Sequence, residues 1–182
     1  MNEQSNPHIP QQNIILDTNI LQYTGNKKFS VELILYLADL ARRGFGFAIS
    51  DVTYYELLSG TTVKQEQQSI ELLDKFNRYF VEITVLIAAS RLSTLYYHQC
   101  KLEGRTSHDI SFEDKIIAST AILTGSLILT ANINDFPRPF FQEAEEKAIF
   151  YRDRNITKML ILQLLRPNQT IILQRFQERP RG

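Results

Sequence analysis

The chain has 182 residues, of which 43% are hydrophobic and 22% charged, as expected for a globular protein with one sizeable core. Lys plus Arg and Asp plus Glu number 20 each, and a formal net charge of zero argues against a DNA-coating or polybasic membrane-binding protein. It does not exclude an enzyme acting on nucleic acid, because an acidic metal site can offset a basic rim. Cys100 is the only cysteine, which excludes a disulfide framework and a cysteine-rich zinc site.

The same features bear on the compartment. The lone cysteine and the lack of a recognisable signal peptide favour the reducing cytoplasm. The longest uncharged run, residues 116–134, is interrupted by Gly125 and Ser126 and diluted by hydroxyl residues. We therefore expect no transmembrane span and no membrane partner.

Apolar periodicity and capping residues predict strands and helices that alternate along the chain. This order implies an α/β fold, a three-layer α/β/α sandwich with a mostly parallel sheet. Residues 1–12 are polar, contain two prolines and are expected to be a flexible lead-in. The expected elements of residues 13–141, taken as one domain, are strand 13–16, helix 30–43, strand 45–49, helix 51–60, helix 61–79, strand 80–83, helix 84–101, loop 104–110, helix 112–123 and strand 127–130.

Residues 142–182 are interpreted as a C-terminal extension packed on the same domain. Within it, 148–152 and 157–165 are read as a β-hairpin, although a helix over 157–165 fits nearly as well because both faces of that segment are apolar. A last helix capped by Asn168 and ending at Gln177 is expected to precede a frayed tail, 178–182.

Four acidic residues lie where predicted strands meet predicted helices. Asp17 directly follows the first strand, Glu56 lies in the helix after the second, Asp114 opens the helix at 112, and Asp135 follows the strand at 127–130. Parallel topology brings these positions to one edge of the sheet. Clustered carboxylates repel one another, and a divalent cation is the direct remedy. Mg²⁺ takes oxygen ligands and keeps several waters, so a few carboxylates suffice.

The chemistry of such a site is phosphoryl displacement, because a carboxylate-held cation can activate water and stabilise the reacting oxygens. No cluster of Cys or His suggests zinc or a thiol nucleophile. Each acid also has a structural reading. Asp17 to Asn19 is a typical turn, Asp114 forms a capping box with Ser111, and Asp135 precedes a proline-rich turn.

Four short motifs, in this order, resemble the motifs of PIN-domain ribonucleases. Each is weak alone, but all four in register across residues 13–136 are fairly specific. The motifs are Leu16–Leu21 (LDTNIL), Ser50–Leu57 (SDVTYYEL), Phe112–Ala118 (FEDKIIA) and Leu129–Phe136 (LTANINDF).

This resemblance implies a parallel α/β/α sandwich and Mg²⁺- or Mn²⁺-dependent cleavage of RNA. It also implies the role of a VapC-like toxin restrained by an antitoxin protein, and many relatives dimerise, so a homodimer is a further expectation. Carried over by position, Asp17, Glu56, Asp114 and Asp135 are the expected catalytic acids. Asp17, Asp114 and Asp135 are the expected metal ligands.

Four polar residues are expected to support these acids. Thr18 or Asn19 would orient Asp17, Thr130 would hydrogen-bond into the site, and Asn132 competes with Asp135 for the role of fourth ligand. The chain also runs past the compact toxin length, and its extension has no counterpart in the family pattern. Basic residues in nearby loops are candidates for contacts with RNA phosphates: Lys27, Lys28, Lys64, Arg105, Lys115 and Arg138.

Two other functions remain open at this point. The fold could serve as a PIN-like module that binds RNA or a protein with little turnover. A phosphatase of the haloacid-dehalogenase type also uses an Asp after the first strand, but it usually places a second Asp where this chain has Asn19.

Overall fold

The computed structural model describes residues 12–104 and 110–177. The expected lead-in at 1–12, the loop at 104–110 and the tail at 178–182 lie wholly or mostly outside these residues. The described elements, in chain order, are β1 (Asn13–Leu16), α1 (Thr18–Thr24), α2 (Ser30–Arg42), β2 (Gly46–Ser50), α3 (Asp51–Ser59), α4 (Val63–Leu73), β3 (Asn77–Tyr79), α5 (Ile83–Leu102), α6 (Phe112–Thr124), β4 (Leu127–Thr130), a short 3₁₀-helix (Ile133–Asp135), β5 (Phe141–Asp153), β6 (Ile156–Pro167) and α7 (Gln169–Gln177).

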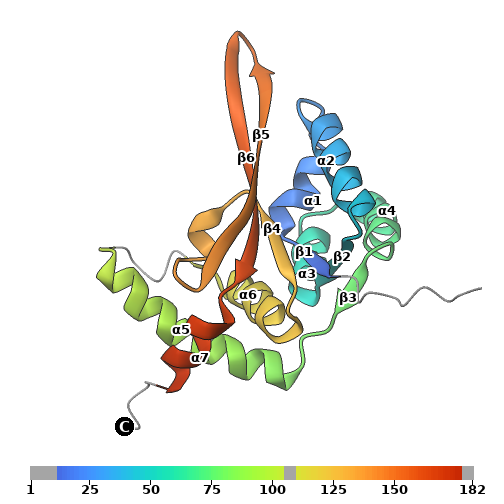
Figure 1. Cartoon of the computed structure of the whole chain (residues 1–182). Coiled ribbons are helices and arrows are strands. Elements are labelled where there is room, and N and C mark those ends of the chain that lie inside the picture. The colour runs from blue at the N-terminus through green and yellow to red at the C-terminus, as the bar shows by residue number, and fades with distance from the viewer. Residues whose placement is uncertain (1–11, 105–109, 178–182) are drawn as a thin grey trace, which may run out of the picture.

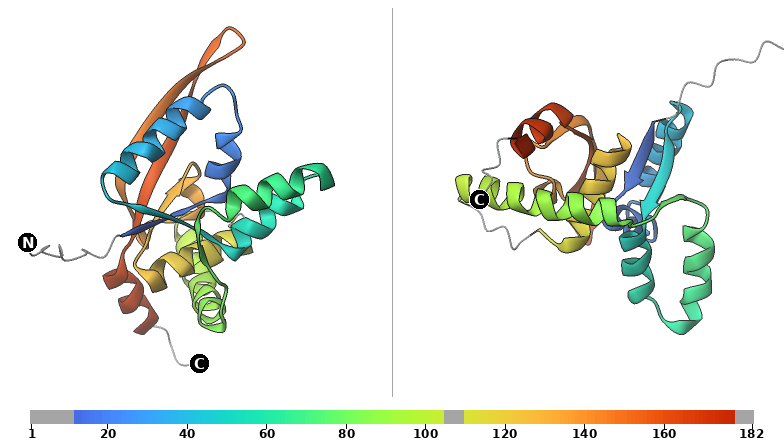
Figure 2. Two further views of the ribbon diagram at one scale, coloured as in Figure 1. Left: turned by 90° about the vertical axis from the view of Figure 1, so that its right-hand side faces the viewer. Right: turned by 90° about the horizontal axis from the view of Figure 1, so that it is seen from below.

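The strands form one sheet in the order β3-β2-β1-β4-β6-β5. β3, β2, β1 and β4 are parallel, whereas β6 runs antiparallel to β4 and β5 antiparallel to β6. Helices cover both faces, with α1 and α2 on one side and α5, α6 and α7 on the other (Figures 1 and 2). The predicted three-layer α/β/α sandwich with a mostly parallel sheet is confirmed.

Strand β1 has apolar side chains on both faces because it lies inside the sheet with helices above and below. Ile14 and Leu16 pack with Leu33 of α2 in one hydrophobic cluster. Ile15 points to the opposite face and packs with Ile117 of α6 in the second cluster. This two-sided burial fixes the register of β1 and the position of the residue that follows it.

The extension forms a long hairpin, as interpreted from the sequence, and its strands exceed the expected bounds. Thr130 at the end of β4 pairs with Gln163, so residues 156–162 of β6 continue past the carboxyl ends of the parallel strands. At ~3.3 Å per residue, these seven residues extend roughly 23 Å beyond that edge. Figure 1 shows the hairpin projecting from the rest of the sheet. Both faces of β6 are apolar near its base because Leu164 and Leu165 enter different core clusters.

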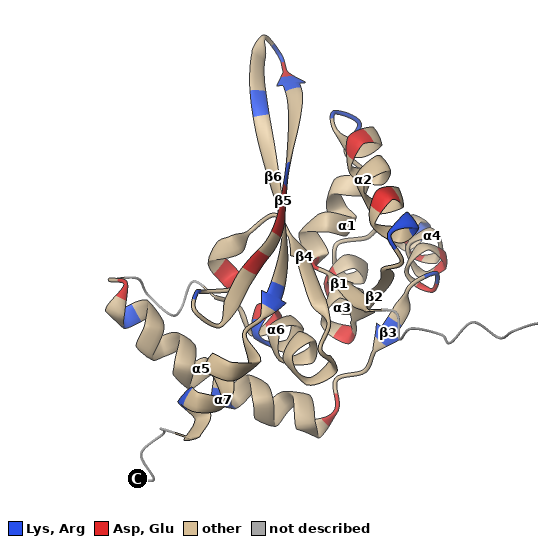
Figure 3. Ribbon diagram, in the orientation of Figure 1, with Lys and Arg blue, Asp and Glu red and all other residues tan. Residues whose placement is uncertain are grey.

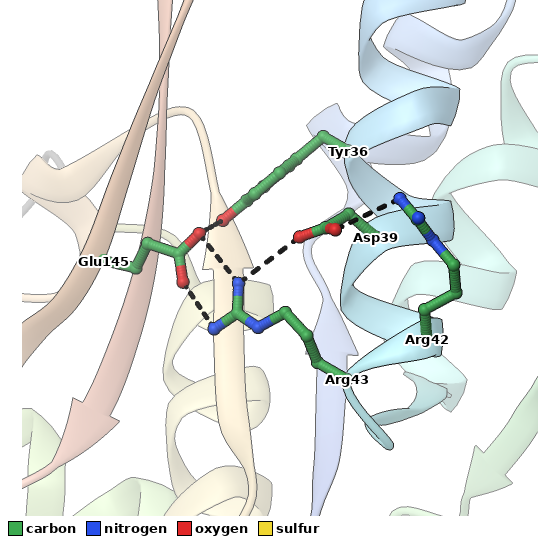
Figure 4. A network of polar contacts seen from close by, with 5 residues as sticks. All are labelled: Tyr36, Asp39, Arg42, Arg43 and Glu145. Carbon is green, nitrogen blue, oxygen red and sulfur yellow. Dashed lines mark hydrogen bonds and ion pairs between the residues drawn. The ribbon is translucent and has the colours of Figure 1, made fainter.

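A polar network fastens the hairpin to α2 (Figure 4). Glu145 of β5 accepts hydrogen bonds from Arg43 at 2.7 and 3.1 Å and from the Tyr36 hydroxyl at 3.1 Å. Asp39 lies 3.6 Å from the same guanidinium. The Arg43 guanidinium holds the pKa of Glu145 below its usual range.

Two parts of the sequence prediction are wrong. The helix expected over 61–79 ends at Leu73, and the next strand is β3 rather than residues 80–83. The residues of β3 do not form an apolar run, because this short edge strand leaves Asn77 and Arg78 exposed. Asp51 of α3 binds Arg78 at 2.5 Å and the backbone N–H of Val81 at 2.9 Å, a long-range contact that local periodicity does not reveal.

Helix α1 was also not predicted. It begins directly after Asp17, where residues 17–19 had a turn as their structural interpretation, and it spans seven residues. Gly125 does end α6 as expected, and it adopts the left-handed conformation (φ +67°) that favours glycine. None of the helices in the described part of the chain combines the length and apolar composition needed to cross a bilayer.

Substitution of Glu145 by Gln should lower the free energy of unfolding by about 1 kcal/mol at pH 7, because a charge-assisted pair becomes a neutral one at a partly exposed position. The folded-state pKa of Glu145 is lowered, so its contribution is present above the unfolded value near 4.5 and is lost as the pH falls through the folded value. Urea unfolding of wild type and variant at pH 7 and below pH 4 measures this.

The matched control is Glu146→Gln, an exposed acid next in the strand. It should change stability by less than about 0.5 kcal/mol. Equal effects of the two substitutions would show that the contact with α2 does not stabilise the hairpin.

Candidate active site

Asp17 is the most buried of the four predicted acids, with 4% of its surface exposed. Its backbone N–H donates to the carbonyl oxygen of Leu129 at 3.0 Å, which joins the ends of β1 and β4. Burial raises the pKa of its carboxyl to about 6, the Thr130 hydrogen bond opposes this rise, and the charge of Asp114 adds to it. The carboxylate is therefore held where its ionised form is disfavoured.

Thr130 and Asn19 orient this carboxylate, as the sequence predicted. The Thr130 hydroxyl and the Asn19 amide each donate to Asp17 Oδ2 at 2.6 Å. The side-chain oxygen of Asn19 accepts from the backbone N–H of Ala131 at 3.1 Å, so the amide orientation is fixed from both ends. Thr130 Oγ1 also accepts from the backbone N–H of Asn132 at 2.9 Å.

Of the two residues expected to orient Asp17, Asn19 donates to it from its side chain and Thr18 from its backbone N–H. The Thr18 hydroxyl donates to Oε2 of Glu56. Glu56 lies half-buried on α3. Burial raises its pKa, the Thr18 hydrogen bond lowers it, and the charges of Glu113 and Asp114 raise it. Thr18 thus links the first motif to the second.

Asp114 forms the capping box anticipated from the sequence. Its Oδ2 accepts from the Ser111 hydroxyl at 2.7 Å and from the Ser111 backbone N–H at 3.1 Å. The backbone N–H of Asp114 donates to the Ser111 hydroxyl at 3.0 Å. This cap fixes the carboxylate at the start of α6, and it does not prevent a catalytic role because a carboxylate has further lone pairs.

Asp135 lies in the 3₁₀-helix after β4 and accepts a hydrogen bond from the Asn132 amide at 2.6 Å. The two candidates for the fourth ligand are therefore bonded to each other. The charge of Asp135 acts with that of Asp114 on the hydroxyl of Tyr96. The role of Asp135 as a metal ligand stays a prediction.

Asp114 is the common neighbour in this arrangement. Its charge contributes to the raised pKa of both Asp17 and Glu56. Together with the charge of Asp135, it also acts on the hydroxyl of Tyr96. The acids nevertheless do not form a ready-made cage: within residues 12–104 and 110–177, no three Asp, Glu, His or Cys side chains group closely enough to hold a metal ion.

The residues present fit a magnesium-type cation bound by few protein ligands. The available donors are carboxylate, hydroxyl and amide oxygens, which Mg²⁺ and Mn²⁺ prefer, and Mg²⁺ sites commonly use one or two carboxylates with waters and substrate phosphates. A cation between Asp17 and Asp114 would relieve the repulsion that raises the pKa of Asp17.

Two residues near the site were not selected from the sequence. The Tyr96 hydroxyl is fully buried without a hydrogen-bond partner in the described structure, and burial, followed by the charges of Asp114 and Asp135, raises its pKa. Glu113, read as a solvated acid, is half-buried and acts on Glu56. The sequence could not identify Tyr96 as a site residue, because a tyrosine on an apolar helix is typical of a hydrophobic core. Glu113 could have been selected, because it is the sequence neighbour of Asp114.

The basic residues expected around the acids differ in their contacts and in their exposure. Lys115 donates to the carbonyl oxygen of Ile110 at 2.8 Å, and Arg138 lies 3.8 Å from Glu143. Lys27 and Lys28 are exposed in the turn between α1 and α2, where Figure 3 shows basic residues close to the hairpin. Arg105 lies outside the described residues.

The fold and the acids at its carboxyl edge define a PIN-like α/β/α protein. A chain of the VapBC2 complex from Rickettsia felis, solved with a DNA fragment from their promoter, aligns with a TM-score of 0.55 and 25% identity, over 69% of this chain and 91% of that chain. The resemblance to VapC-like PIN-domain proteins indicated by the four motifs is thereby confirmed.

Two further solved structures have the same fold. A chain of a toxin–antitoxin complex from Klebsiella pneumoniae gives a TM-score of 0.54 at 24% identity, covering 69% of this chain and 92% of that chain. A chain of VapBC-1 from nontypeable Haemophilus influenzae gives 0.53 at 22% identity, covering 69% and 90%. No family model and no curated protein matches the sequence.

Replacement of Asp17 by Asn should stabilise the metal-free protein at pH 7. Because the folded-state pKa of Asp17 is raised from 3.8 to about 6, the folded protein holds this proton more tightly, and wild-type stability falls as the pH rises through that interval. The variant lacks this fall and should be more stable above pH 6 by up to about 3 kcal/mol. Urea unfolding in EDTA from pH 4 to pH 7 measures the difference.

Glu66→Gln, at an exposed acid of α4, is the matched control and should leave the pH dependence of wild type unchanged. Parallel stability curves for wild type and Asp17→Asn would contradict the described burial of Asp17.

Proposed function

We propose that the chain is a metal-dependent endoribonuclease that hydrolyses RNA phosphodiester bonds. The observation that carries this proposal is the buried carboxylate of Asp17 at the carboxyl edge of the sheet, in the field of Asp114. The similarity to chains of VapBC and toxin–antitoxin complexes supports it. An oxygen-lined, negatively charged edge suits a hard cation, and a cation bound there would in turn attract a phosphate.

In this proposal Asp17 and Asp114 hold Mg²⁺ or Mn²⁺, with Asp135 as a further ligand. Hydrogen bonds from Thr130 and Asn19 fix one carboxylate, and the Ser111 cap fixes the other, so little reorganisation is needed on binding. When bound, the cation supplies charge neutralisation at the phosphate and lowers the pKa of a water molecule.

Glu56 is proposed to accept the proton of the attacking water. Its pKa is raised by burial and by Glu113 and Asp114, which moves it toward the range where a carboxylate is an effective base. The Thr18 hydroxyl holds Oε2 of Glu56, leaving Oε1 for the water. This assigns Thr18 to positioning of the base.

The proposed cellular role is that of the toxin in a toxin–antitoxin pair. Its support is that three structural neighbours come from such complexes. The proposed partners are accordingly a cognate antitoxin protein and a second copy of this chain.

The alternative is a PIN-like module that binds RNA or protein with little turnover. One observation favours it, namely that the described acids do not gather three at a time into a group able to hold a metal ion. The two readings differ in whether the acids are needed for cleavage, and one experiment separates them.

The purified chain should cleave single-stranded RNA in Mg²⁺ or Mn²⁺ and lose this activity in EDTA. Asp17→Asn and Asp114→Asn should each reduce the rate roughly 100-fold or more, because each removes a fixed charge needed in the transition state. Gel analysis of a labelled RNA panel gives the rates.

Glu66→Gln, which removes an exposed charge on α4, should retain wild-type activity. RNA binding without cleavage by wild type would favour the binding module. Cleavage that survives in both Asp variants would exclude the proposed site.

A further inference from the structure

The end of the hairpin and the adjoining turn form a concentrated positive surface, which we call the basic tip. It comprises five exposed cationic residues around one acid, Asp153, in a chain whose charges balance as a whole. The cationic residues are Lys27, Lys28, Arg152, Arg154 and Lys158. Figure 3 shows basic residues both at the hairpin end and in the turn that precedes α2.

The basic tip projects from the same edge of the sheet as the acids. β6 runs antiparallel to β4 and passes its carboxyl end at Gln163, so the residues before Gln163 extend outward from that edge. α1 likewise begins there, directly after Asp17, and leads into the turn carrying Lys27 and Lys28. A strand bound at the acids and running outward therefore meets the basic tip.

Contacts hold the two halves of the basic tip together. Asp153 binds Lys158 and Lys28, each at 2.5 Å, which joins the hairpin to the turn before α2. The rings of Phe29 and Tyr151 pack beneath, with centroids 4.9 Å apart. This support makes the spacing of the charges a property of the fold.

The excess of positive charge on the basic tip favours a polyanionic partner. One carboxylate is shared by Lys28 and Lys158, and within residues 12–104 and 110–177 no ion pair engages Lys27, Arg152 or Arg154. Arginine side chains bind phosphate oxygens with two parallel N–H groups, and lysines bind them as point charges. A row of phosphates satisfies such a surface along its length.

We propose that the basic tip binds the phosphate backbone of the RNA strand that is cleaved at the acidic edge, several nucleotides from the scissile bond. This inference rests on the proposed ribonuclease function. It assigns the extension, which has no counterpart in the family pattern, to substrate binding.

The test is RNA affinity of the double variant Arg152→Gln/Arg154→Gln, measured in EDTA so that cleavage does not interfere. The probe is a fluorescent 20-nucleotide single-stranded RNA, titrated from 50 to 300 mM salt. Loss of two phosphate contacts should weaken binding roughly tenfold at 100 mM salt and lower the salt slope by about 1.4. Lys75→Gln/Arg91→Gln, at exposed cationic residues of the segment before β3 and of α5, should leave both values unchanged.

RNA binding that is absent, or equal in the tip variant and the control, would overturn the proposal, even if an acidic protein is found to bind the tip. A tip dependence seen only with a DNA strand of the same sequence would also overturn it. Tip-dependent binding of RNA that is never cut would uphold this contact and reject the nuclease function. RNA cleavage by a protein whose RNA binding does not depend on the tip would uphold the nuclease function and reject the proposed contact.

Discussion

The hydrogen bond from the Thr130 hydroxyl to Asp17 Oδ2, at 2.6 Å, joins the ends of the two central strands and fixes the carboxylate on which the site depends. The same strand ends are tied by the Asp17 N–H bond to Leu129. Burying this carboxylate beside the charge of Asp114 disfavours its ionised form. The fold therefore stores an unfavourable electrostatic arrangement at one edge, and a bound proton or cation relieves it.

The central elements were predictable because their signals are local. β1, β2 and β4 are short apolar runs bounded by polar residues, and α2, α5 and α6 have helical periodicity or clear caps. β3 was not predictable, since an exposed edge strand has no apolar run and is held by Asp51 from a distant segment. Local patterns likewise cannot distinguish a helix from a strand where both faces are apolar, as in β6.

The candidate acids could be selected from the sequence together with some of their partners, namely Asn19, Thr130 and Ser111, whereas other partners could not. Four motifs located Asp17, Glu56, Asp114 and Asp135. The bond from Thr18 to Glu56 and the pairing of Asn132 with Asp135 depend on side-chain directions that no spacing encodes. The contact between the hairpin and α2 could not be predicted for the same reason, because Glu145 binds a residue about a hundred positions away in the sequence.

The central claim is that the carboxyl edge holds a hard cation between Asp17 and Asp114. Crystals of the protein grown with Mn²⁺ test it directly through the anomalous signal of the metal. The account predicts a peak about 2.0–2.2 Å from oxygens of both carboxylates, with waters in the remaining positions. A structure in saturating Mn²⁺ with no peak at these residues, or with the ion bound elsewhere on the molecule, would contradict it.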